Sequence, residues 1–130
     1  MCENVNKEVI KMGKICARTK FDQSDFYKNL KANEVTVKKI GENRVEYSFK
    51  PGYSIQYERI FNYDTQTKDY FFGNRLNLYY AGELLHMFYW RDHKEQLQRY
   101  SGLYILYKAV TDKLKQQQIN DMYKAYEASK

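Results

Sequence analysis

Proline, glycine and cysteine are scarce in this sequence. Among 130 residues there is one proline, Pro51, together with six glycines and two cysteines, Cys2 and Cys16. So little glycine and proline excludes collagen-like and low-complexity chains. Two cysteines, both near the N-terminus, do not make the dense spacing of a secreted disulfide scaffold. We therefore expect a reduced, cytoplasmic protein.

Long apolar runs and recognisable catalytic motifs are also missing. The longest apolar run, Leu84–Trp90, includes His86 and is much shorter than the roughly 20 residues of a membrane-spanning helix. The sequence has no glycine-rich phosphate loop, no dinucleotide-binding fingerprint and no HExxH or CxxC spacing. Its cysteines and histidines are too scattered to indicate a zinc site. We predict no membrane partner, no metal, no cofactor and no catalytic residues.

Aromatic and basic residues are plentiful instead. The 14 tyrosines, seven phenylalanines and one tryptophan make up 17% of the chain, which argues against disorder and for one folded domain over residues 1–130. The formal charge of +6 is concentrated at the two ends. Residues 1–40 carry +4 and residues 91–130 carry +3, whereas residues 41–90 carry −1. A nucleic acid would therefore meet the terminal segments first.

The N-terminal part is predicted to be helical. Four apolar residues recur at helical spacing, and four basic residues, called the basic stripe below, follow the same spacing on the opposite side. The apolar set is Val5, Val9, Met12 and Cys16, and the basic stripe is Lys7, Lys11, Lys14 and Arg18. A second helix is expected to begin at Asp22, a favourable N-cap, and to bury Phe26, Tyr27 and Leu30.

The middle of the chain shows the period-two alternation of β-strands. This alternation predicts four or five antiparallel strands joined by turns. The expected strands are Val35–Lys38, Arg44–Lys50, Tyr53–Glu58 with an extension to Tyr63, Tyr70–Tyr80 and Glu83–Arg91. The alternation slips at Ile60, where we expect a bulge. We also expect a polar loop over Asp64–Asp69 and a potential break at Gly73-Asn74.

The C-terminal part is expected to form a long helix. Asp92 and Glu95 have the spacing of a capping box, and apolar residues continue at helical spacing to Leu114, with a potential kink at Ser101-Gly102. A further amphipathic set predicts either a continuation of this helix or a short last helix: Ile119, Met122, Tyr123 and Tyr126. The sequence thus predicts an α+β fold. An antiparallel four- to five-stranded meander sheet carries N-terminal helices and a long C-terminal helix packed on one face.

A group of aromatic and arginine residues on the last two strands is the main candidate binding site. Arg75, Tyr79, Tyr89 and Arg91 share one sheet face in the expected alternation, and the helices are expected to cover the other face. Such a surface suits the stacking of bases and the pairing of phosphates, or equally a protein interface. Ordinary cross-strand pairs in a tyrosine-rich sheet would look the same. The basic stripe could follow a phosphate backbone or simply face solvent.

The sequence resembles, in its general style, the orphan proteins of AT-rich phages and mobile elements. The features that carry the resemblance are a short chain rich in Lys, Tyr and Asn, few alanines, a single proline and no catalytic motif. Such proteins often act by stoichiometric binding, including inhibition of host defence nucleases such as CRISPR effectors. The resemblance implies a non-catalytic inhibitor of a host nucleic-acid-handling protein or protein–nucleic acid complex.

Two other functions remain open at this stage. The protein could bind DNA or RNA directly through the same surface, or it could be a small enzyme that uses His86 as a base, oriented by Glu46 or Glu58. A self-complementary aromatic surface would also permit a homodimer.

Overall fold

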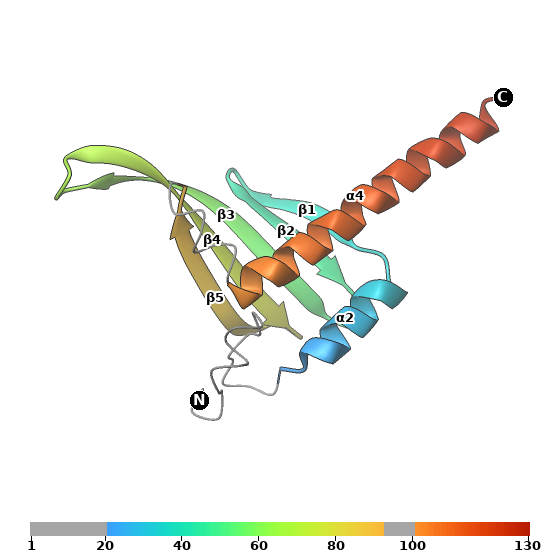
Figure 1. Cartoon of the computed structure of the whole chain (residues 1–130), viewed down its shortest axis with the longest axis horizontal. Helices are drawn as coiled ribbons and strands as arrows, with labels where there is room; N and C mark the ends of the chain where they lie inside the picture. Colours follow the sequence, from blue (N-terminus) through green and yellow to red (C-terminus); the bar gives the residue numbers. More distant parts are fainter. Residues whose placement is uncertain (1–20, 93–100) are drawn as a thin grey trace.

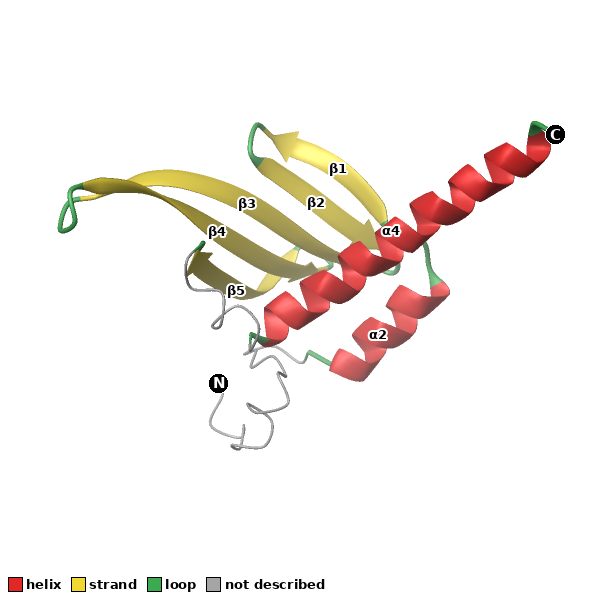
Figure 2. Cartoon of the chain, turned by 45° about the horizontal axis from the view of Figure 1, so that its top comes forward, coloured by secondary structure: helices red, strands yellow, loops and turns green. Residues whose placement is uncertain are grey.

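The computed structural model describes residues 21–92 and 101–130, and these residues form one antiparallel sheet with two helices on one of its faces (Figures 1 and 2). The elements are α2 (Gln23–Ala32), β1 (Thr36–Gly41), β2 (Arg44–Phe49), β3 (Tyr53–Asp64), β4 (Asp69–Tyr80), β5 (Glu83–Arg91) and α4 (Gly102–Ala128). The five strands pair in the order β1-β2-β3-β4-β5, which is a meander. The predicted α+β fold class is confirmed. The expected first helix, and the expected first turns of the C-terminal helix after its N-cap Asp92, lie outside the described residues.

Helix α2 begins where the sequence indicated. The Asp22 carboxylate accepts hydrogen bonds from the backbone amides of Ser24 and Asp25, at 2.9 and 3.2 Å, and so caps the helix. Phe26 and Leu30, one turn apart, are buried against the sheet. The helix ends at Ala32, and the extended backbone of its C-cap residue Asn33 leads into β1.

The core lies between the sheet and the two helices. Alternate residues of the strands point to this side, which we call the helix-side face, and meet the buried side chains of α2 and α4. The fully or nearly fully buried apolar residues are Phe26, Leu30, Val35, Phe49, Tyr53, Ile55, Leu76, Leu78, Trp90, Leu103, Leu106 and Val110. The opposite side of the sheet, called the open face below, is not covered by any element of the described residues (Figure 2).

The β3–β4 hairpin is longer and more regular than expected. Its pairing runs without a shift from Tyr53↔Tyr80 to Asp64↔Asp69, so the predicted bulge at Ile60 and the potential break at Gly73-Asn74 are both wrong. The alternation continues because Arg59, a polar residue, takes the helix-side position between Tyr57 and Phe61, and its guanidinium is bound by Asn74 and Asp92. The expected polar loop shrinks to a four-residue turn over 65–68.

The register shifts in the sheet lie elsewhere, one between β1 and β2 after Lys39 and one between β4 and β5. The β4–β5 register shifts between Leu78 and Tyr79, because Leu78 pairs with His86 and Tyr79 with Leu84. Leu85 is therefore an extra residue, as in a β-bulge. The shift places Leu84 on the open face with Tyr79, whereas His86, Phe88 and Trp90 lie on the helix-side face.

Helix α4 is one continuous helix. Ser101 is its N-cap, with a hydroxyl that accepts from the Tyr104 amide, so Ser101-Gly102 begins the described helix and does not kink it. Leu103, Leu106 and Val110 are buried on the sheet, and the C-terminal half continues past the sheet into solvent (Figure 1). Among the described residues, neither helix has the length and apolar composition needed to cross a membrane.

Candidate functional site

A two-stranded arm projects from one end of the sheet. The last β2–β3 pair is Arg44↔Glu58 and the last β4–β5 pair is Gly73↔Arg91, so both neighbouring strands end before the β3–β4 hairpin does. Residues 61–72, which we call the aromatic arm, form the part of the hairpin beyond them. In Figure 1 the arm points away from both helices.

Four aromatic rings cover the helix-side face of the arm, beyond the reach of the helices. They are Phe61, Tyr63, Tyr70 and Phe72, and each is between 45% and 61% exposed. Their rings pack on one another. The Phe61 and Tyr70 rings are nearly parallel with centroids 5.1 Å apart, and the Phe61–Phe72 and Tyr63–Tyr70 centroids are each 5.0 Å apart. The arm thus presents a continuous apolar patch to solvent.

A buried polar network fixes the arm at its base. Asn74 is only 2% exposed, and its side-chain oxygen accepts from the Tyr57 hydroxyl at 2.5 Å and from Arg59 at 3.1 Å. Its amide nitrogen donates to Asp92 at 2.7 Å. Arg59 also makes a bidentate pair with Asp92, at 3.0 and 2.7 Å, and its guanidinium lies 4.5 Å from the centre of the Phe72 ring. The hydrogen bonds to Asp92 raise the pKa of Arg59.

The sequence-predicted residues of the last two strands do come together on the open face. Arg75 lies directly opposite Tyr89, and Arg91 lies opposite Gly73. Tyr79 is four residues along β4 from Arg75 and therefore shares its face. The Tyr89 phenol lies over Gly73, where a Cβ atom would overlap it, so the missing side chain makes room for the ring. These four residues form one surface, although nothing in the structure shows a ligand on it.

The arginines of this surface are already paired with carboxylates. Arg75 lies 3.5 Å from Glu58, and Arg91 lies 3.0 Å from Asp64 while its guanidinium stacks 3.8 Å from the centre of the Phe71 ring. Asp64 also accepts backbone amides of its turn, which together with Arg91 lower its pKa. An ion-paired surface of this kind has little positive charge left for phosphates.

The enzyme hypothesis meets a geometric obstacle. His86 pairs with Leu78, which is fully buried, and so lies on the helix-side face. Glu46 and Glu58 belong to the open face, since the register from Glu46 passes through Gln56 and Asn77 to Met87. The pairing of His86 with Glu46 or Glu58 that the enzyme hypothesis requires is therefore not formed, because the sheet separates them. Burial lowers the pKa of His86.

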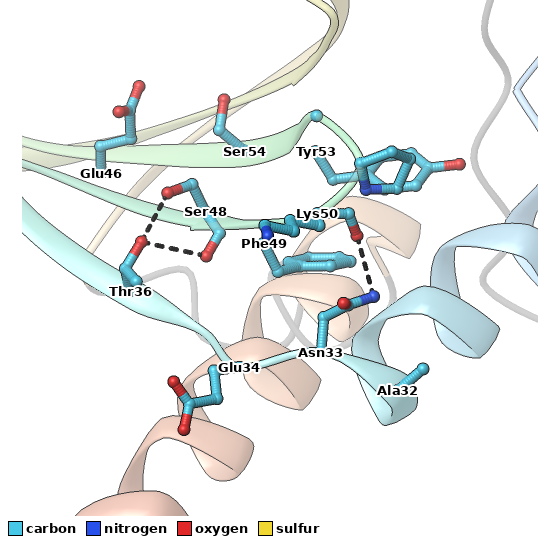
Figure 3. Close-up of a pocket in the computed structure, with 12 residues that line it drawn as sticks. Ala32, Asn33, Glu34, Thr36, Glu46, Ser48, Phe49, Lys50, Tyr53 and Ser54 are labelled. Atoms are coloured by element: carbon cyan, nitrogen blue, oxygen red, sulfur yellow. Dashed lines mark hydrogen bonds between the residues drawn. The ribbon is translucent and has the colours of Figure 1, made fainter.

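A groove of mixed polar and apolar lining lies at the other end of the sheet, and polar side chains in it are hydrogen-bonded within the fold. It has a volume of about 680 Å³ and lies where α2 ends and β1, β2 and β3 meet (Figure 3). The Thr36 hydroxyl lies 2.8 Å from the Ser48 hydroxyl, and Asn33 donates to the Lys50 carbonyl at 3.3 Å. These contacts hold strand ends together. No group of three or more His, Cys, Asp or Glu side chains is placed to hold a metal ion in the part of the chain that the structure describes.

The structure does not describe the basic stripe, and it reveals the aromatic arm, which the sequence did not indicate as a binding surface. Lys7, Lys11, Lys14 and Arg18 lie outside the described residues. The arm was missed, because Asp64–Asp69 looked like a loop that ended both strands. The available signal was the alternation that runs through Phe61 and Tyr63 and resumes at Tyr70 and Phe72.

Comparison with known proteins adds no relative. No protein-family model, no curated protein and no solved structure matches the chain. The function is therefore inferred from the surfaces of the protein, the aromatic arm and the open face of the sheet.

Proposed function

We propose that the protein acts without catalysis, by stoichiometric binding of a protein partner to the aromatic arm. The observation that carries this proposal is the patch of four exposed rings on the helix-side face of the arm. Large aromatic side chains contribute much of the binding energy at protein interfaces, because each buries a large area at a small cost in conformational entropy. The mutual stacking of the rings lowers that cost further by ordering them before binding.

The charge of the arm favours a protein over a nucleic acid. Residues 61–72 contain Asp64, Lys68 and Asp69, which give a net charge of −1. A phosphate backbone requires unpaired cationic groups, and the arm does not supply a track of them, since Lys68 is the one basic residue in 61–72. Stacking of bases on the rings remains chemically feasible, but without a cationic track it would be weak.

The aromatic rings of the arm suit a basic partner surface. Arg59 and Arg91 already stack on Phe72 and Phe71, so the arm's rings accept guanidinium groups over their faces. Arginine and lysine side chains of a partner can use the exposed faces of Phe61 and Tyr70 in the same way. Proteins that handle nucleic acids present such cationic surfaces. We therefore propose that the partner is a host nucleic-acid-handling protein, such as a defence nuclease, which the arm inhibits by covering its basic site.

The test compares two equally exposed tyrosines. A photo-crosslinking residue is placed at Tyr70 on the arm and, separately, at Tyr126 on α4; both side chains are 61% exposed. The protein cross-linked from position 70 is identified and purified, and its affinity and stoichiometry are measured by calorimetry. We expect a one-to-one complex that Tyr70→Ala weakens at least about tenfold and Tyr126→Ala leaves unchanged.

Two results would contradict the proposal. An affinity that is insensitive to Tyr70→Ala would remove the arm from the interface. Tight binding to DNA or RNA that falls steeply with salt and survives Tyr70→Ala would favour direct nucleic-acid binding instead. Circular dichroism of each variant checks that the fold is unchanged.

A further inference from the structure

Arg91, one of the residues that the sequence indicated as a binding residue, connects the sheet to the aromatic arm. It is the last residue of β5 and lies opposite Gly73, at the base of the arm. Its guanidinium lies 3.8 Å from the centre of the Phe71 ring and 3.0 Å from the Asp64 carboxylate. Asp64 and Asp69 form the last pair of the β3–β4 hairpin. The Arg91 side chain therefore runs along the open face of the arm from its base towards its tip.

Asp64 extends this contact to the turn that closes the arm. Its carboxylate accepts the backbone amides of Gln66 and Thr67, at 2.9 and 3.3 Å, as well as the Arg91 guanidinium. The Gln66 amide, Arg91 and the Thr67 amide together lower the pKa of Asp64, so the carboxylate stays charged at neutral pH. The end of β5, the Phe71 ring, the carboxylate and the turn thus form one connected path.

A second arginine holds the helix-side face of the arm in the same manner. Arg59 comes just before the arm on β3, and its guanidinium lies 4.5 Å from the centre of the Phe72 ring. Asp92 binds this guanidinium through two hydrogen bonds. Phe71 and Phe72 are neighbours on β4 and point to opposite faces. Each face of the arm thus has a guanidinium on a ring and a carboxylate that fixes the guanidinium.

The arm needs such support because the neighbouring strands end at its base. The β2–β3 register ends at Glu58 and the β4–β5 register at Gly73. Apart from one hydrogen bond between the Asp92 amide and the Phe72 carbonyl, the strands of the arm pair only with each other within the described residues. A two-stranded hairpin by itself is only marginally stable in water. The stacked rings cover the helix-side face, whereas the open face has the contacts of Arg91.

We propose that Arg91 is a positioning residue, which holds the aromatic arm in one ordered conformation before any partner binds. The inference rests on the proposed function only in taking the arm as the binding surface. A hairpin that becomes ordered on binding loses part of its binding energy to that ordering. An arm that is braced by Arg91 presents its rings already in place, and Arg91 contributes through Phe71 and Asp64 without touching the partner.

The backbone amides of Asn62 and Phe71 report on the order of the arm. The two residues are register partners, and they direct their backbone groups to each other, because the Arg59 amide points towards β2 and successive residues alternate. Gln56 and Asn77 form a pair of the same kind inside the five-stranded part of the sheet. The amides of this second pair, called the control amides below, report on the rest of the hairpin.

Hydrogen exchange of the free protein compares Arg91→Ala with Arg75→Ala. Arg75 is the matched control, because it also lies on the open face and pairs with a carboxylate, that of Glu58 at 3.5 Å, but both residues lie outside the arm. We expect Arg91→Ala to raise the exchange rates of the Asn62 and Phe71 amides about tenfold, since it removes one ion pair and one cation–π contact. The control amides should exchange as in the wild type. Arg75→Ala should leave the two arm amides unchanged.

Asp64→Asn separates the contact with Arg91 from the closure of the turn. Asparagine keeps a side-chain oxygen for the amides of Gln66 and Thr67, but it lacks the charge that binds Arg91. We expect faster exchange of the two arm amides in this variant as well. Combining it with Arg91→Ala should cause no further acceleration beyond that of Arg91→Ala, because both changes break the same contact.

Four results would overturn the inference. They are arm amides that exchange in the wild type as fast as in an unfolded chain, unchanged arm exchange in Arg91→Ala, an equal acceleration at the control amides, and additive effects of Arg91→Ala and Asp64→Asn. None of these measurements needs a partner. An ordered arm that binds no protein would contradict the proposed function and leave this inference standing. A disordered arm would overturn this inference even where Tyr70→Ala weakens the binding of a partner.

Discussion

Asn74 shows at the scale of one residue how a polar side chain is accommodated in this core. Its oxygen receives two hydrogen bonds, from Tyr57 and Arg59, and its nitrogen donates to Asp92. An asparagine amide that is almost fully buried has a high desolvation cost, which these partners offset. The network also closes the base of the aromatic arm, since Arg59 stacks on Phe72. Asn74 therefore links the core to the candidate binding surface.

Replacing Asn74 should destabilise the whole protein. Asn74→Ala removes a shared partner of Tyr57, Arg59 and Asp92 in a buried position, so the free energy of unfolding should fall by about 2–4 kcal/mol. Urea denaturation followed by circular dichroism measures this change. Asn62→Ala, at an exposed position on the arm, is the matched control and should change the stability by less than about 0.5 kcal/mol. Equal losses of unfolding free energy in the two variants would contradict a stabilising role of the hydrogen bonds around Asn74.

At the scale of whole elements, two polar side chains of α4 bind the backbone of the segment that joins α2 to β1. Gln117 pairs with the backbone of Val35, accepting from its amide at 2.8 Å and donating to its carbonyl at 2.9 Å. One turn earlier, the Lys113 ammonium donates to the carbonyls of Leu30, Lys31 and Asn33 at the end of α2. A positive charge there also interacts favourably with the helix dipole, although burial lowers the Lys113 pKa.

The two hydrogen bonds between Gln117 and the Val35 backbone, called the Gln117 clamp below, can be tested with Gln116 as the control. Gln117→Ala removes both partners of the nearly buried Val35 backbone, and we expect a loss of about 1–3 kcal/mol in unfolding free energy. The Val35 amide should also exchange faster with solvent, as measured by hydrogen exchange. Gln116→Ala removes only a hydrogen bond to Asn120 on the exposed side, so its stability should be close to wild type. Unchanged exchange at Val35 in Gln117→Ala would rule out the clamp.

The apolar side of α4 changes direction along the helix. Leu106 faces the sheet, whereas Met122, sixteen residues later, is turned about 160° around the axis. Ile119, Tyr123 and Tyr126 share the side of Met122 and are all more than half exposed. The C-terminal half of α4 is thus not an extension of the core, and the sheet cannot bury its apolar stripe by a simple shift of the helix. Both halves have a helical apolar pattern in the sequence, which is why one continuous helix could be expected there.

At the scale of the whole molecule, the sequence predicts what local patterns determine. The order of strands and the two helices follow from alternation, turn residues and caps, each of which involves neighbours in the chain. The regular register of the β3–β4 hairpin past Glu58 does not, because Arg59 interrupts the apolar alternation and a bulge was expected at Ile60. The partners of Arg59, Asn74 and Asp92, are 15 and 33 positions away. The aromatic arm depends on that long-range pairing, and so only the structure reveals it. The open-face cluster was found in the sequence because it needs only strand alternation.

Most of the net positive charge of the chain lies outside the residues that the structure describes. Residues 21–92 and 101–130 hold 15 basic and 13 acidic side chains, so +4 of the net +6 belongs to the remaining residues. Any binding of DNA or RNA at low salt should therefore depend on the basic stripe and not on Arg75 or Arg91, whose charges are paired with Glu58 and Asp64. Fluorescence anisotropy at several salt concentrations measures this. Changing all four residues of the basic stripe to Glu should weaken binding and lower the salt slope by about four, roughly one unit per lost phosphate contact. Arg75→Ala with Arg91→Ala should leave both quantities unchanged, and a reduced slope in that variant would show that the open face holds phosphates.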